Sequence, residues 1–239
     1  MTKLSVNLNK IALIRNSRGG NLPDLVKVAK DCERFGAQGI TIHPRPDQRH
    51  ARYSDVAALK EVVTTELNIE GYPTDKFMEI VLLHQPDQVT LVPDPPGALT
   101  SDHGWDTLGN KDFLIDIIQA LKSKGIRTSL FIDADPKWVE GARQIGADRV
   151  ELYTGPYAHQ FPDDPDLAIR AHHLASLKAR ELGLGLNAGH DLNLNNLKFY
   201  QSGVVGLKEV SIGHALVCDA IYMGLEKTIG AYLSLLTRA

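Results

Sequence analysis

The sequence predicts a single α/β domain over residues 1–239, folded as a (β/α)8 barrel (the TIM-barrel fold), with room for extra short helices in the βα loops. Eight short apolar or β-branched segments alternate with eight segments of helical periodicity, and no long linker or change of composition separates them. A chain of 239 residues is also of ordinary length for one such barrel.

The expected strands are short and rich in β-branched or apolar residues, as buried parallel strands are. In chain order they cover residues 3–7, 39–43, 68–71, 88–92, 127–132, 149–153, 185–187 and 209–212. The helices that follow them are expected at residues 23–35, 54–66, 74–84, 110–124, 136–144, 165–182, 193–201 and 214–237. An open doubly wound sheet is the alternative, but no G-x-G-x-x-G motif follows the first strand, and eight strands close a barrel.

The helix assignments depend on apolar residues spaced three and four positions apart. This spacing is clear at Leu25, Val28, Ala29 and Cys32, and again at Phe113, Ile117, Ile118 and Leu121. Helix starts are marked by candidate N-caps and one first-turn proline, namely Ser54, Thr74, Asn110 and Pro136. Three helices are expected to end at a glycine just before the next strand: Gly125, Gly146 and Gly183.

The net charge of −3 is unevenly distributed along the chain. Residues 10–52 hold nine Lys or Arg against four Asp or Glu, a balance of +5, whereas residues 53–239 have a balance of −9. A nucleic-acid partner usually demands a broad basic face, so this island favours a small phosphorylated ligand instead.

Other features of composition bear on where the protein works. No apolar run approaches the ~18 residues of a membrane span, and the amino-terminal residues lack the apolar stretch of a signal peptide. We therefore expect a cytoplasmic protein with no membrane partner. Cys32 and Cys218 both fall in expected helices and are predicted to be reduced core residues rather than a disulfide or a metal pair.

The run His-Pro-Arg-Pro-Asp-Gln-Arg-His at residues 43–50 is the most informative segment of the chain. It follows a buried strand, and its two prolines make it a stiff loop. Two arginines and two histidines at the end of a strand can hold an anion and move a proton. Arg49 and His50 alone would also fit a solvated turn, whereas His43 is expected to face inward.

Polar groups recur where the other expected strands end. Most of the eight strands end, at once or within three residues, in a group able to carry charge or exchange a proton, among them Lys10, His43, Glu70, Asp133, Glu151, His190 and His214. In a (β/α)8 barrel these ends lie together on the face that carries active sites. Charged groups at such a mouth cost free energy unless they are paired or used, so the convergence predicts an active site.

Several stretches of the chain resemble the pyridoxine 5′-phosphate synthases. They are V-N-L-N-K with R-N-S-R-G-G, I-T-I-H-P-R-P-D-Q-R-H, N-I-E-G, S-L-F-I-D-A-D, V-E-L-Y-T-G-P-Y-A, N-A-G-H-D-L and I-G-H-A. The match runs from the first strand to the last helix with the spacing intact. The resemblance implies a transferase-type ring-closing enzyme of vitamin B6 synthesis. It condenses 3-amino-2-oxopropyl phosphate with 1-deoxy-D-xylulose 5-phosphate, releasing inorganic phosphate and water.

The resemblance also implies a role for each matching residue. His43 and Glu70 match the proton acceptors of the family, His190 matches its proton donor, and Glu151 matches a residue that stabilises a developing positive charge. The grip on the pentulose phosphate is matched by Arg45, His50 and Thr100. The grip on the amino-ketone phosphate is matched by Asn7, Arg18, Gly213 and His214.

The family further implies an enzyme without metal or organic cofactor that assembles as a homo-octamer, a tetramer of dimers. The expected last helix, 214–237, is apolar over more than one stripe. That pattern fits a subunit interface, but it also fits a buried closing helix.

The chain departs from the family's pattern at two places. Many members carry Asp-His where this chain has Asn9 and Lys10, and Gly where it has Asp191. Lys10 can hold a phosphosugar but cannot act as a neutral proton shuttle, so we expect Asn9 and Lys10 to bind substrate. Because a carboxylate repels phosphate, we expect only the backbone of Asp191 to face the ligand.

The long segment 93–109 after the fourth strand is expected to be a lid that excludes water during dehydration, rather than an ordinary polar loop. In the family the corresponding loop closes over substrate.

Two other functions stay open at the level of sequence. A metal-dependent phosphosugar epimerase would use His43, His190, His214 and a carboxylate as ligands, but no H-x-H or H-x-x-E pair supports it. A phosphate-ligand binding or regulatory barrel would need the cationic and glycine-rich groups, yet it has no use for Glu70 and Glu151 in the mouth.

Overall fold

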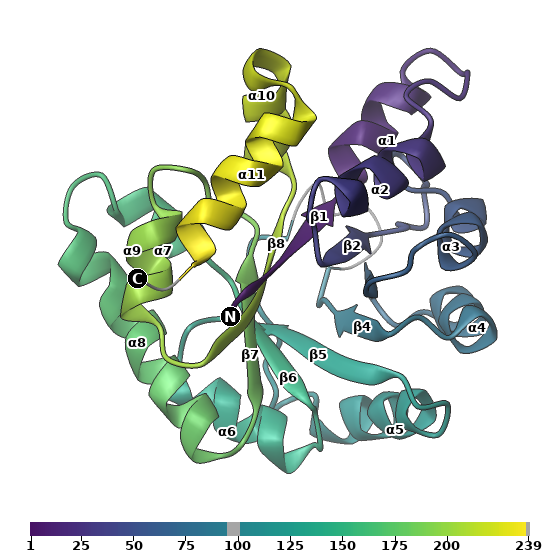
Figure 1. Cartoon of the computed structure of the whole chain (residues 1–239). Helices are drawn as coiled ribbons and strands as arrows, with labels where there is room; N and C mark the ends of the chain where they lie inside the picture. The colour runs from purple at the N-terminus through teal and green to yellow at the C-terminus, as the bar shows by residue number, and fades with distance from the viewer. Residues whose placement is uncertain (95–100, 238–239) are drawn as a thin grey trace.

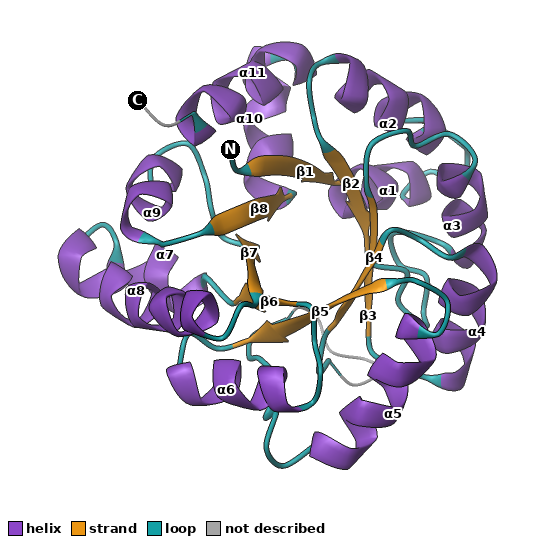
Figure 2. Ribbon diagram, turned by 60° about the horizontal axis from the view of Figure 1, so that its bottom comes forward, coloured by secondary structure: helices purple, strands orange, loops and turns teal. Residues whose placement is uncertain are grey.

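The computed structural model, which describes residues 1–94 and 101–237, contains a closed barrel of eight parallel strands in sequence order. The strands are β1 (Lys3–Asn7), β2 (Gly39–Ile42), β3 (Leu67–Gly71), β4 (Gln88–Leu91), β5 (Arg127–Ile132), β6 (Arg149–Leu152), β7 (Gly185–Gly189) and β8 (Leu207–Ile212). β1 pairs with β8 as well as β2, which closes the ring that Figure 2 shows, with the helices outside it. The predicted TIM barrel is confirmed.

The helices are α1 (Asn9–Asn16), α2 (Leu25–Arg34), α3 (Tyr53–Lys60), α4 (Asp75–His84), α5 (Lys111–Lys122), α6 (Pro136–Gln144), α7 (Gly155–Gln160), α8 (Pro165–Glu181), α9 (Leu197–Gly203), α10 (His214–Met223) and α11 (Leu225–Leu236). α1 and α7 are extra short helices in βα loops. The expected helix 214–237 is wrong as one piece, because it is divided at Gly224, whose backbone (φ 78°, ψ 150°) is incompatible with a helix.

Some of the predicted helix starts and ends are confirmed by the structure, and others are wrong. Thr74 caps α4 by accepting a hydrogen bond from the Phe77 amide, and Pro136 lies in the first turn of α6. Ser54 is not an N-cap, because α3 begins one residue earlier, after Arg52. Asn110 precedes α5 but makes no side-chain capping bond. The glycines that follow α5, α6 and α8 have left-handed φ angles of 71°, 85° and 70°, as the C-terminal signals predicted (Gly125, Gly146 and Gly183).

The apolar core lies between the barrel and the helices, and the interior of the barrel is polar. Ser5 and Thr41 share a hydrogen bond of 2.7 Å, Asn68 donates to Thr41 over 3.3 Å, and Thr90 donates to Asn68 over 3.0 Å. Interiors of such barrels are usually filled by Val, Ile and Leu. Here hydrogen-bonded polar side chains fill the space below the mouth instead.

An ionic cluster occupies the amino-terminal end of the barrel. Glu66 contacts Lys3 at 3.2 Å and is also paired with Arg127, while Arg149 lies 3.6 Å from Glu209. Pairing stabilises these charges where water is scarce. The opposite, carboxyl-terminal end is therefore the end at which the barrel opens.

The remaining composition-based expectations can be compared with the structure. No helix in the described ranges is both long and apolar enough to span a bilayer. Both cysteines are free thiols. Cys32 is buried, and burial raises its pKa to about 12. The prediction that Cys218 is a core residue is wrong, because α10 packs through Leu216 and Val217 and turns Cys218 outward.

Candidate active site

The carboxyl ends of the strands surround a cavity of about 1330 Å³. The predicted site residues that line it are Asn7, Asn9, Lys10, His43, Arg45, His50, Glu70, Glu151, His190, Asp191, Gly213 and His214. They come from six different strand ends or the loops after them. The structure thus brings together side chains that lie up to two hundred residues apart in the sequence.

Two asparagines connect the ends of the first three strands. Asn7 Nδ2 donates to Glu70 Oε2 over 3.3 Å, and Asn7 Oδ1 accepts from the Asn9 amide over 3.0 Å. Asn9 Oδ1 in turn accepts from the His43 amide over 2.8 Å. His43 Nδ1 lies 4.0 Å from Glu70 Oε2. The asparagines therefore fix the relative positions of the imidazole and the carboxyl.

Glu70 and Glu151 are two carboxyls held away from water at the floor of the cavity. Burial raises the pKa of each to about 8, although Arg45 and the hydrogen bond from Asn7 act in the opposite direction on Glu70. Glu151 is 3% exposed, and its Oε2 has no hydrogen-bond partner among the residues that the structure describes. At pH 7 both groups are mainly neutral acids, and a cation placed beside them would favour release of their protons.

The two histidines of the 43–50 loop are neutral at physiological pH. Burial, followed by the charge of Arg45, lowers the pKa of His43 well below its ordinary value and that of His50 to about 4. Their rings meet edge to face, with centroids 6.0 Å apart. His50 Nδ1 accepts from the Ala51 amide over 3.0 Å, so its proton lies on Nε2. A neutral His43 is able to accept a proton.

Arg45 is held against the wall of the cavity by Asp94, a residue that the sequence analysis did not select. Arg45 Nη2 lies 2.5 Å from Asp94 Oδ2, and the same oxygen accepts from Ser101 Oγ over 2.5 Å. The Arg45 and Asp94 side chains are 7% and 2% exposed. The contact ties the 43–50 loop to the loop after β4, and it positions one edge of the guanidinium.

His190 follows β7 in a left-handed backbone conformation with φ of 41°. Its Nδ1 lies 2.7 Å from Asp191 Oδ2, and the Tyr153 ring meets it edge to face at 5.9 Å. Burial lowers the pKa of His190, but the hydrogen bond and charge of Asp191 outweigh it, so the net change is upward. We expect only the backbone of Asp191 to face the ligand, and the structure adds that its side chain is hydrogen-bonded to His190.

The end of β8 lies beside the end of β1. α10 begins at His214, directly after Gly213, so its first amides lie at the cavity. A Cβ on Gly213 would come 3.0 Å from Asn7 Cβ and 3.1 Å from Asn7 O. A side chain at position 213 would therefore crowd Asn7, and glycine suits this close approach of β8 to β1.

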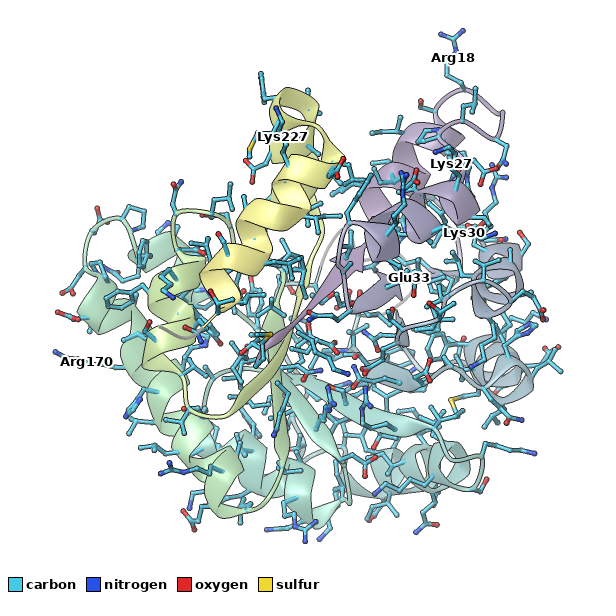
Figure 3. All side chains as sticks on the ribbon, viewed as in Figure 1. Arg18, Lys27, Lys30, Glu33, Arg170 and Lys227 are labelled. Atoms are coloured by element: carbon cyan, nitrogen blue, oxygen red, sulfur yellow. The ribbon has the colours of Figure 1, made fainter. Side chains whose placement is uncertain are left out.

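One predicted residue does not line the cavity, and another cannot be placed. Thr100 lies outside the described residues. Arg18 is exposed and is absent from the cavity lining, and Figure 3 shows its side chain pointing outward from the loop that follows α1. Of the expected lid 93–109, only residues 93, 94 and 101–109 are described, among which Ser101 and Asp102 line the cavity.

The structure adds residues that sequence reasoning missed. Tyr153, His159 and Ser211 line the cavity. Tyr153 and Ser211 could have been found by extending the list of strand-end residues by two positions, since they lie that far from Glu151 and Gly213. His159 could not, because it lies in α7, a helix that carries no clear periodic signal. Within residues 1–94 and 101–237, no three His, Cys, Asp or Glu side chains are grouped so that they could hold a metal ion.

A barrel that gathers buried carboxyls, imidazoles and cations at its carboxyl-terminal mouth is of the enzyme class that acts on small molecules. Residues 4–238 match the family described as Pyridoxal phosphate biosynthesis protein PdxJ. The chain therefore belongs to the PdxJ family, the pyridoxine 5′-phosphate synthases.

Individual relatives agree with that assignment. The chain is 58% identical to pyridoxine 5′-phosphate synthase of Parabacteroides distasonis over 232 residues, covering 97% of this chain and 98% of that protein. It is 59% identical to the protein of the same name from Cytophaga hutchinsonii, covering 98% of each.

Solved structures show the fold alone. A 4-hydroxy-2-oxoglutarate aldolase/2-deydro-3-deoxyphosphogluconate aldolase shares 18% identity with this chain at a TM-score of 0.63, covering 98% of this chain and 94% of that one. Phosphoribosyl anthranilate isomerase from Thermotoga maritima shares 12% identity at a TM-score of 0.63, covering 99% and 98%.

Proposed function

We propose that this protein condenses 3-amino-2-oxopropyl phosphate with 1-deoxy-D-xylulose 5-phosphate to form pyridoxine 5′-phosphate, inorganic phosphate and water. The observation that carries the proposal is the pair of carboxyls, the partly buried Glu70 and the buried Glu151, in one cavity with His43 and His190. The reaction joins an amine to a ketone, removes water and phosphate and closes a ring, so it moves protons at several positions. Groups with pKa values near neutrality are suited to that work.

The cavity offers two places for phosphate. Arg45 and His50 bind the pentulose phosphate, and Asn9 and Lys10, which follow the neighbouring strand β1, line the same cavity. His50 contributes a neutral N–H rather than a charge. The second grip, for the amino-ketone phosphate, is the start of α10 at Gly213 and His214, beside Asn7. There the backbone amides of the helix bind the anion.

Proton transfer then divides among three groups. His43 is neutral, and it takes protons from the amine nitrogen and from carbon. Glu70, 4.0 Å from His43, is mainly protonated in the empty site. The positive charge of the bound amine lowers the pKa of Glu70, which then acts as a carboxylate base. His190 donates protons to the departing oxygens.

Glu151 stabilises the cationic stage of the reaction. Its pKa of about 8 in the empty site means that a proton must leave before it bears charge. An iminium nitrogen near Glu151 favours that ionisation, and the resulting ion pair forms where water is excluded. Such an interaction is stronger with the cation than with the neutral substrate, and it therefore accelerates the reaction.

The proposed reaction needs neither a metal ion nor an organic cofactor, because each step is an addition, an elimination or a proton transfer between the two substrates. The rival functions fit the site less well. A phosphosugar epimerase would need three converging metal ligands, which the described residues do not provide. A binding barrel would gain nothing from two destabilising buried carboxyls.

We also propose that the protein works as an octamer in the cytoplasm. Ile221 and Tyr222 on α10 are 72% and 91% exposed, and α1, which contacts α10, exposes Leu13 and Ile14. Figure 1 shows these two helices rising side by side above the barrel. Arg18 points outward beyond α1 and could serve a phosphate only in the site of an adjoining copy.

Phosphate release separates the three functions. The purified protein should release inorganic phosphate only when both substrates are present. A binding protein would release none, and an epimerase would transform the pentulose phosphate alone. Phosphate release that did not depend on the amino ketone would contradict the proposed condensation.

A further inference from the structure

The backbone of His190 is clamped on both sides by one buried threonine. Thr154 Oγ1 donates to the carbonyl oxygen of Gly189 over 2.6 Å, and it accepts from the amide of Asp191 over 3.2 Å. Asn196 Nδ2 additionally donates to the Asp191 carbonyl over 3.3 Å. A non-glycine residue with φ of 41° is unfavourable, and it persists here because its neighbours hold it.

The strained backbone places the side chain of His190 against that of Asp191. The Nδ1–Oδ2 distance is 2.7 Å, and the two side chains are 35% and 38% exposed. Other groups that act on this imidazole come from two further elements, Glu151 and Tyr153 on and after β6 and Asp94 after β4. Asp191 is hydrogen-bonded directly to the ring.

We propose that Asp191 is a positioning residue that orients the His190 ring and keeps it protonated for proton donation. The proposal rests on the function proposed above, in which His190 is the donor. With Nδ1 bound to Asp191, the proton that His190 gives up is the one on Nε2. A carboxylate that orients an imidazole in this way also stabilises its imidazolium form.

The step balances without a further reactant. The Nε2–H bond breaks as an O–H bond forms on the departing hydroxyl, and the electrons of the C–O bond leave with water. His190 becomes neutral and regains a proton from solvent. The ion pair also explains how a carboxylate is tolerated beside a phosphate site, since Asp191 with protonated His190 has no net charge.

The test is a histidine titration by NMR, combined with kinetics, on the full-length protein. The His190 signal is identified by its loss in His190→Asn. In the unmodified protein its midpoint should lie above 6.5, the ordinary value. In Asp191→Asn it should fall below 6.5, because burial then outweighs the remaining carboxylates. kcat should fall roughly tenfold at pH 8 and less at pH 6, where a larger fraction of the His190 imidazole is protonated in both proteins.

Two further variants make the result specific. Asp191→Glu should restore part of the titration shift and part of the activity at pH 8. Asp102→Asn removes a carboxylate that lies 2.6 Å from His103 at the same mouth, and it should leave the His190 midpoint unchanged. A purely structural role of Asp191 would give an equal loss of kcat at both pH values.

The inference can fail separately from the proposed function. A His190 midpoint that is the same in Asp191→Asn as in the unmodified protein would overturn the role of Asp191, whatever reaction is catalysed. A midpoint that falls while the pH profile of kcat stays fixed would overturn the role of His190 as donor, and with it this use of Asp191.

Discussion

Replacing Glu151 by Gln should stabilise the protein at high pH and leave its stability at low pH almost unchanged relative to the wild type. Burial raises the pKa of Glu151 from 4.5 to about 8. A carboxyl with a raised folded-state pKa contributes stability that is present below the unfolded pKa and is lost as pH rises through the folded pKa. Glutamine has nearly the same shape as the neutral acid and never ionises.

The size of this effect follows from the same two pKa values. A difference of about 3.5 pH units corresponds to about 5 kcal/mol of unfolding free energy, as an upper bound at pH above 8. For a chain of 239 residues that is a gain on the order of 10 °C in Tm at pH 9. If the amide packs less well than the neutral carboxyl, that cost is the same at pH 5 and at pH 9. It therefore cancels when the changes of Tm at the two pH values are compared.

Calorimetric unfolding at pH 5, 7 and 9 measures the effect, with Glu61→Gln as the control because Glu61 is exposed. The gain from Glu151→Gln should grow between pH 5 and pH 8 and then level off, while the control stays flat. An equal change of Tm at pH 5 and pH 9, or a loss at pH 9, would refute the reasoning that a buried carboxyl is kept at a cost in stability.

Three other predictions follow from the site. Glu70→Gln should keep the fold and substrate binding but lower kcat by roughly 10²–10⁴, and an unchanged kcat would leave Glu70 a structural group. Gly213→Val should press on Asn7, 3.0 Å away, raising KM for the amino-ketone phosphate more than for the pentulose phosphate; equal KM effects would count against the helix-start phosphate site. Borohydride treatment with the pentulose phosphate should leave no mass adduct on Lys10, whereas a reduced adduct would make it a Schiff-base lysine.

The strand order and the identity of the mouth residues could be predicted because both depend on local pattern. The residues of a strand such as β2, Gly-Ile-Thr-Ile, are largely apolar and β-branched, and the polar residues 43–50 that follow it predict a loop. Once eight such units are counted, the barrel rule places every strand end on one face. No side-chain geometry is needed for that step.

Side-chain partnerships could not be predicted in the same way. Asp94 is one polar residue in a loop until the fold brings it 2.5 Å from Arg45, forty-nine positions earlier. The Asp191 side chain looked repulsive to phosphate because the sequence does not reveal that His190 takes a left-handed conformation and pairs with it. The break at Gly224 was missed because apolar spacing continues across it into α11.

The most direct test of the account is to identify the product formed from both phosphorylated substrates. Each substrate is labelled with ¹³C in turn, and the mixture is followed by NMR. The account predicts a pyridine ring that contains carbon from both substrates, formed in a one-to-one ratio with inorganic phosphate. A folded protein that binds both substrates and yields no labelled pyridine would contradict it.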